Sequence, residues 1–130
     1  MSGIEYFTSP GVKAAKLPFS EAVRVGDVLY LSGQIGFDFE KGALVTGGME
    51  AEARQTMENI GRTLAARGLS FADVFKCTVM LADMKRWADF NKVYVGYFPS
   101  GRYPTRSAFG ASGLAMGAQL EVECWAFLKR

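Results

Sequence analysis

The stretch LEVECWAFL (residues 120–128) alternates like a β-strand whose two faces differ in chemistry. One predicted face is small and aliphatic, and it consists of Leu120, Val122, Cys124, Ala126 and Leu128. The other carries carboxylates and large aromatics, namely Glu121, Glu123, Trp125 and Phe127. Leaving such aromatics in water forfeits several kcal/mol at ~25 cal/mol per Å2 of apolar surface. We therefore expect helices on the aliphatic face and another subunit on the aromatic face.

Two β-prone runs and a long amphipathic helix precede this strand. Gly26-Asp27 joins residues 19–25 to residues 28–35, which predicts an antiparallel hairpin. From Met49 onward, apolar residues recur at helical spacing until Gly68, a typical C-terminal stop. The sequence therefore predicts a hairpin followed by a helix that packs on the sheet.

The second half of the chain repeats the change from strand to helix. A dense apolar strand is predicted over residues 74–81, after a capping-box sequence at residues 70–73. Asp83 then caps a predicted helix whose aromatic stripe we interpret as core: Trp87, Phe90, Tyr94 and Tyr97. With a further short strand over residues 107–110, the order is strand, strand, helix, strand, helix, strand, strand. This order predicts an α+β fold with two helices on one sheet face, as a single domain over residues 1–130.

Composition and charge exclude several function classes. The chain has 130 residues, a net charge of +2 and scattered basic residues, so its charge does not indicate a nucleic-acid partner. It contains no histidine, which removes the usual general base and most zinc sites, and no metal-ligand spacing is present. Cys77 and Cys124 lie in apolar runs and are interpreted as core thiols. Without an apolar leader or membrane-length segment, we expect a cytoplasmic protein.

Arg106 is the principal candidate for ligand binding. It follows Tyr103-Pro104, where proline stiffens the chain, and a guanidinium presents paired donors that match a carboxylate. A structural ion pair with Glu121 or Glu123 is the plainer explanation of such an arginine. Gly33, at the end of a predicted strand, indicates either a close approach of ligand or a β-bulge.

Several segments together resemble the RidA/YjgF family of imine deaminases, formerly described as endoribonuclease L-PSP or translation-initiation inhibitors. Asn91, Tyr94 and Phe98 match in order and spacing. So do the segments PFSEAV (18–23), LSGQI (31–35), EARQTMENI (52–60), KCTVMLADM (76–84), PTRS (104–107) and EVE (121–123).

The resemblance implies a chorismate-mutase-like subunit with a mixed β-sheet, assembled as a homotrimer with ligand clefts between subunits. It implies hydrolysis of 2-imino acids derived from 2-aminoacrylate and related enamines to 2-oxo acids and ammonia, without a cofactor, as in 2-iminobutanoate/2-iminopropanoate deaminases. Arg106 matches the carboxylate-binding arginine, and Glu121 matches the glutamate that positions water. Ser32, Gly33 and Asn91 match positions beside the ligand.

Two positions depart from the family pattern. Ala108 stands where many members have cysteine, so any ligand contact there would use the backbone. Phe19 stands where tyrosine is frequent, and losing that hydroxyl removes a hydrogen bond of about 1 kcal/mol and favours an apolar substrate side chain. These departures motivate the alternative of a non-catalytic module that binds or senses 2-oxo acids. A ribonuclease or translation inhibitor is a third possibility, for which a near-neutral, histidine-free chain offers no obvious machinery.

Overall fold

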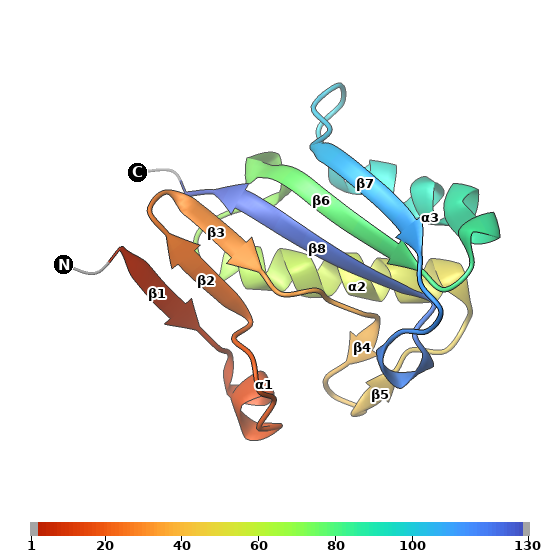
Figure 1. The fold of residues 1–130 in the computed structure, drawn as a ribbon, viewed down its shortest axis with the longest axis horizontal. Helices are drawn as coiled ribbons and strands as arrows, with labels where there is room; N and C mark the ends of the chain where they lie inside the picture. The colour runs from red at the N-terminus through yellow and green to blue at the C-terminus, as the bar shows by residue number, and fades with distance from the viewer. Residues whose placement is uncertain (1–2, 129–130) are drawn as a thin grey trace.

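A six-stranded mixed sheet, with two helices packed on one face, forms the centre of the computed structural model, which describes residues 3–128 (Figure 1). The strands lie in the order β1-β2-β3-β8-β6-β7, and a separate two-stranded sheet pairs β4 with β5. Their bounds are β1 (Ile4–Phe7), β2 (Ala22–Val25), β3 (Val28–Leu31), β4 (Phe37–Asp38), β5 (Ala43–Leu44), β6 (Val74–Leu81), β7 (Thr105–Gly110) and β8 (Leu120–Phe127). The α-helices are α1 (Pro10–Ala14), α2 (Met49–Ala65) and α3 (Trp87–Tyr94).

The core lies between the aliphatic face of β8 and the apolar side of α2. Leu120, Val122, Cys124 and Ala126 are all buried, whereas Phe127 is exposed. On α2 the buried apolar residues recur at helical spacing, and they are Met49, Ala53, Met57, Ile60 and Leu64. The predicted division of the last strand into two faces is therefore confirmed.

The hairpin of β2 and β3 is also confirmed, although both strands are shorter than predicted. Val25 pairs with Val28 across the Gly26-Asp27 connection, and Ala22 pairs with Leu31. Gly26 has a φ of 59°, in the left-handed region that glycine adopts at little cost. The capping box of residues 70–73 is present as well, with reciprocal hydrogen bonds between Ser70 and Asp73.

The predicted element order was incomplete, because it omitted β1, α1 and the β4–β5 pair. β1 has no buried face, so its four residues carry no periodic signal, and β4 and β5 have two residues each. Asp83 caps a short 3-10 helix (Met84–Arg86) that precedes α3, rather than α3 itself. None of the helices described here combines the length and hydropathy of a transmembrane span.

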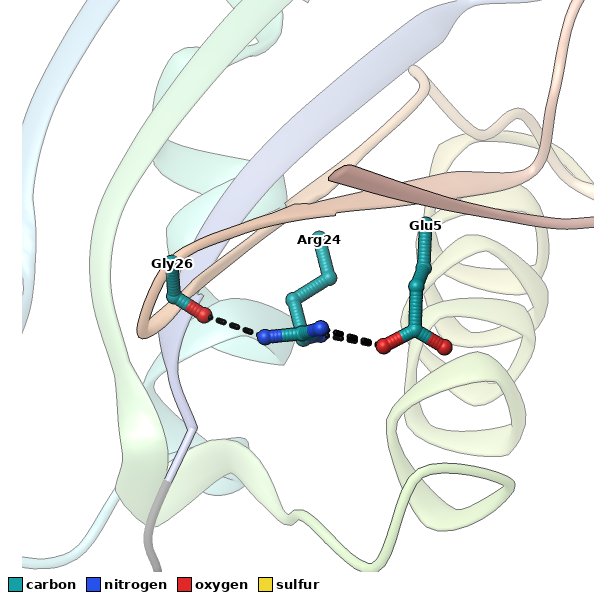
Figure 2. A network of polar contacts seen from close by, with 3 residues as sticks. All are labelled: Glu5, Arg24 and Gly26. Atoms are coloured by element: carbon teal, nitrogen blue, oxygen red, sulfur yellow. Dashed lines mark hydrogen bonds and ion pairs between the residues drawn. The ribbon is translucent and has the colours of Figure 1, made fainter. Parts of the chain in front are cut away.

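A polar network ties β1 to the hairpin (Figure 2). Arg24 on β2 forms an ion pair with Glu5 on β1, including a 2.8 Å hydrogen bond from Nε to Oε1. Another guanidinium nitrogen of Arg24 donates to the carbonyl of Gly26 at 2.9 Å. One side chain thus links the edge strand to the tight turn.

A buried carboxylate joins α2 to the start of β8. Glu52 is buried, and each of its carboxylate oxygens accepts a hydrogen bond from Gln119. The backbone N–H of Gln119 donates at 2.9 Å, and the side-chain amide of Gln119 donates at 3.0 Å. Both bonds fix the point at which the chain enters the central strand.

We expect Glu52→Ala to lower the free energy of unfolding by about 1–3 kcal/mol, because the N–H of Gln119 loses its acceptor in a buried setting. Urea denaturation measures this change. Glu50→Ala is the matched control, since Glu50 lies on the same helical turn but is exposed. Equal effects of the two substitutions would contradict a structural role for the Glu52–Gln119 contact.

Candidate functional site

Arg106 lies on the edge strand β7 and points to the helix side of the sheet. It stands beside Cys77 in the parallel pairing of β6 and β7, and Cys77 is fully buried beneath the helices. One guanidinium nitrogen of Arg106 donates to Oδ1 of Asn91 on α3 at 2.8 Å. Arg106 and Asn91, two of the predicted site residues, therefore lie in contact, and the asparagine holds one side of the arginine.

Aromatic rings surround the same guanidinium. Its central carbon lies 4.7 Å from the ring centroid of Tyr94, 5.6 Å from that of Trp87 and 5.9 Å from that of Phe90. These distances allow cation–π attraction, which favours a fixed orientation of the charge. Interpreting the whole stripe as core was wrong for Trp87, which is 44% exposed. Helical spacing did place Trp87, Asn91 and Tyr94 on one side of α3, and this signal could have identified the surroundings of Arg106.

An open pocket of about 270 Å3 adjoins this group. It is lined by Asn91, Tyr94, Val95, Tyr103, Pro104 and Arg106. Across the described residues, Arg106 makes no ion pair with Glu121 or Glu123, so the plainer explanation of this arginine fails. The contact with Asn91 occupies only one guanidinium nitrogen of Arg106. The other N–H donors of Arg106 remain for a bidentate contact with a small carboxylate.

Glu121 and Gly33 form a second group. Tyr30 on β3 pairs with Trp125 on β8, and Gln34, just beyond β3, pairs with Val122. The chain from Tyr30 to Gln34 is therefore one residue longer than the segment of β8 that it faces. This extra residue is a β-bulge at Ser32–Gly33, one of the two predicted explanations for the glycine. A Cβ atom on Gly33 would collide with the carboxylate of Glu121, so glycine permits their close approach.

The predicted residues Ser32 and Phe19 belong to this second region. The hydroxyl of Ser32 donates to the carbonyl of Ser20 at 2.6 Å, and its N–H donates to the carbonyl of Glu21. These bonds hold the segment that carries Phe19 beside the bulge. Phe19 is 52% exposed and presents an apolar ring to the surroundings.

The two groups lie on opposite faces of the sheet within one chain. Arg106 is in register with Cys77, whereas Glu121 is in register with Met80, three residues further along β6. Side chains an odd number of positions apart on a strand point to opposite faces. Ala108 shares the helix side with Arg106 and packs against the core.

The surroundings of Glu121 alter its acidity. Partial burial is the main cause of a raised pKa, and the neighbouring charge of Glu123 raises the pKa further. Such a carboxyl holds its proton to a higher pH than an ordinary glutamate, which makes its carboxylate a stronger base. Within residues 3–128, no group of three or more His, Cys, Asp or Glu residues could hold a metal ion.

Comparisons with known proteins agree with this architecture. A family model described as Endoribonuclease L-PSP matches residues 11–128. A mouse protein named 2-iminobutanoate/2-iminopropanoate deaminase is 43% identical over 110 residues, covering 85% of this chain and 81% of its own. The crystal structure of RidA from the Antarctic bacterium Psychrobacter sp. PAMC 21119 superposes with a TM-score of 0.82 at 35% identity, covering 98% of this chain and 100% of the other. The predicted α+β fold is confirmed.

Glu123→Gln should lower the pKa of Glu121, because it removes a like charge that disfavours ionisation. A titration of the labelled Glu121 carboxyl by 13C NMR measures the shift. Glu58→Gln is the control, because it removes a carboxylate charge from α2, on the opposite side of the sheet from Glu121. Glu58 accepts a hydrogen bond from Tyr97 there. An unchanged titration of Glu121 in Glu123→Gln would contradict electrostatic coupling between the two carboxylates.

Proposed function

Because the chain belongs to the RidA/YjgF family, we propose that it is a hydrolytic deaminase of reactive 2-imino acids of the 2-aminoacrylate type. The reaction converts a C=N bond and water into a 2-oxo acid and ammonia, so its atoms balance with water alone. A protein that is 43% identical over most of the chain carries the name of this activity. The geometry of Arg106 is the observation that carries the proposal.

Arg106 binds the substrate carboxylate in this proposal. Its guanidinium is oriented by Asn91 and by the ring of Tyr94, lacks an internal ion pair in the described chain, and adjoins an open pocket. A preoriented planar fork favours a carboxylate and places the imine carbon at a fixed distance from it. Phe19 would meet the substrate side chain and favour apolar substituents.

Glu121 orients the attacking water and transfers its proton. As water adds to the carbon of the protonated imine, the carboxylate takes up one proton of the water, and the C=N π electrons become the lone pair of an amine. The carboxyl then returns this proton to nitrogen. The C–N bond breaks and ammonia leaves while the hydroxyl oxygen forms the C=O bond and gives its proton to the carboxylate, which releases it to solvent. The raised pKa of Glu121 suits this exchange, because a carboxylate that binds its proton more tightly is a stronger base toward water.

We further propose a homotrimer in which each cleft combines Arg106 of one subunit with Glu121 and Gly33 of the next. The opposite orientation of the two side chains supports a cleft shared between chains, because a small acid cannot contact both faces of one sheet. The open face also carries exposed aromatics, including Phe75, Phe109 and Phe127. Covering these rings would stabilise an assembly.

Arg106→Ala should reduce kcat/KM by about 10- to 100-fold, the equivalent of losing a charge-assisted contact. The assay couples the protein to an enzyme that generates 2-aminoacrylate and follows pyruvate formation. Arg102→Ala, which alters an exposed arginine on the preceding turn, should behave as wild type. Full activity of Arg106→Ala would refute the assignment. Calorimetric binding of pyruvate without any turnover by wild type would replace it with a 2-oxo acid binding module.

Mixed oligomers test the shared cleft. Arg106→Ala and Glu121→Gln should each be strongly impaired alone, whereas co-expression restores about a quarter of the clefts in a cyclic trimer with random assembly. Light scattering measures the assembly mass, and the coupled assay measures the recovered activity. A double variant co-expressed with wild type is the control for assembly. Failure of co-expressed single variants to recover activity, despite trimer formation, would contradict the two-chain cleft.

A further inference from the structure

A buried pair of thiols lies directly behind the candidate carboxylate site. Cys124 on β8 is directly opposite Cys77 on β6, and Cys77 is directly beside Arg106 on β7. The three side chains therefore form a row across adjacent strands on the helix side of the sheet. Both cysteines are free and fully buried, and their sulfur atoms are 3.3 Å apart.

Tyr94 joins this pair to the site. Its ring lies 4.7 Å from the guanidinium carbon of Arg106, while its buried hydroxyl finds no hydrogen-bond partner among the described residues. Burial is the largest cause of its raised pKa, and the adjacent Cys77 raises the pKa further. The ring thus packs against Arg106 while its hydroxyl end lies near the thiols.

We propose that Cys77 and Cys124 are an oxidisable pair, which a peroxide converts to a cross-strand disulfide, and that this disulfide weakens carboxylate binding at Arg106. The proposed weakening of carboxylate binding rests on the proposed function of Arg106. It assigns to the two cysteines a role beyond filling the core.

The backbone already suits such a bond. Directly opposite residues of antiparallel strands have Cα atoms about 4.5 or 5.5 Å apart, and both spacings lie within the usual disulfide range. The sulfur atoms need only approach from 3.3 Å to about 2.05 Å, by rotation of the side chains.

The two thiols differ in a way that assigns their roles. The contact with Cys124 is the main cause of a lowered pKa at Cys77, and the charge of Arg106 acts in the same direction. The pKa of Cys124 is raised, chiefly by the contact with Cys77 and by burial. Because Cys77 lies beside the Arg106 cation on the neighbouring strand, we assign it as the thiol that attacks the oxidant and Cys124 as the thiol that resolves the product.

The chemistry balances with hydrogen peroxide as the oxidant. The Cys77 thiolate attacks one peroxide oxygen, the O–O bond breaks, and a sulfenic acid forms with release of hydroxide, which becomes water. The sulfur of Cys124 then attacks this sulfenic acid, the S–S bond forms, and a second water leaves with the thiol proton. Two electrons pass from the thiols to the peroxide.

Disulfide formation draws the Cys77 sulfur toward Cys124, away from the hydroxyl end of Tyr94 and from Arg106. The ring of Tyr94 then loses a packing contact, and the surface that orients the guanidinium loosens. The loss of one cation–π contact corresponds to an affinity about threefold to tenfold weaker.

The experiment treats the intact assembly with hydrogen peroxide and reads two independent signals. Peptide mapping by mass spectrometry without reduction should find Cys77 linked to Cys124, with the loss of two hydrogens. Calorimetry with pyruvate should show an affinity about threefold to tenfold weaker after oxidation. Dithiothreitol should restore it, which distinguishes the disulfide from methionine oxidation.

Cys124→Ala supplies the matched control. This variant keeps the Arg106 site, should bind pyruvate as wild type does, and should show no affinity loss that dithiothreitol reverses. A reversible loss in this variant, an unchanged affinity in linked wild type, or no linked peptide would each overturn the proposal. Absence of pyruvate binding to reduced wild type would refute the Arg106 site and the coupling, while the mapping still decides whether the disulfide forms.

Discussion

A strand inside a sheet must divide its side chains between two environments. In β8 the division is regular, because buried and partly exposed residues alternate along most of the strand. It lies between β3 and β6, with small aliphatic residues beneath α2 and carboxylates and Trp125 on the other face. On that open face Tyr30 and Lys76 both pack against Trp125, with the Tyr30 ring centroid at 4.9 Å and Lys76 Nζ at 4.1 Å from the Trp125 centroid. Burial on one face therefore fixes the register of the neighbouring strands.

The same register assigns each candidate site residue to a face. Pairing with β6 places Arg106 on the helix side and Glu121 on the open side. The bulge at Gly33 adds one residue to β3 and lets the backbone approach Glu121. A slip of one residue would exchange the faces of a whole strand, so the apolar core and the site geometry depend on one constraint.

Periodic burial explains which elements could be predicted from sequence. β8 and α2 each have a continuous buried face, and the hairpin has an unambiguous turn, so all of these were predicted. β1 has no such face and is held by strand pairing and by the ion pair of Arg24 with Glu5, which are long-range contacts that local sequence does not encode. In the site, a guanidinium fork and a strand-end glycine could be recognised individually. Their distribution over opposite faces of the sheet could not be predicted, because it follows from the pairing of β6 with β7 and with β8.

The surroundings of Arg106 explain why arginine suits this position better than lysine. The planar guanidinium can lie against the rings of Tyr94 and Trp87 while one nitrogen donates to Asn91. A lysine ammonium would direct its few donors without a fixed plane, and it would be hydrated more strongly. The rings thus fix the plane of the charge, the asparagine fixes its rotation, and the remaining donors are free to bind a ligand in the adjoining pocket. Orientation in this site is produced by apolar packing as much as by hydrogen bonding.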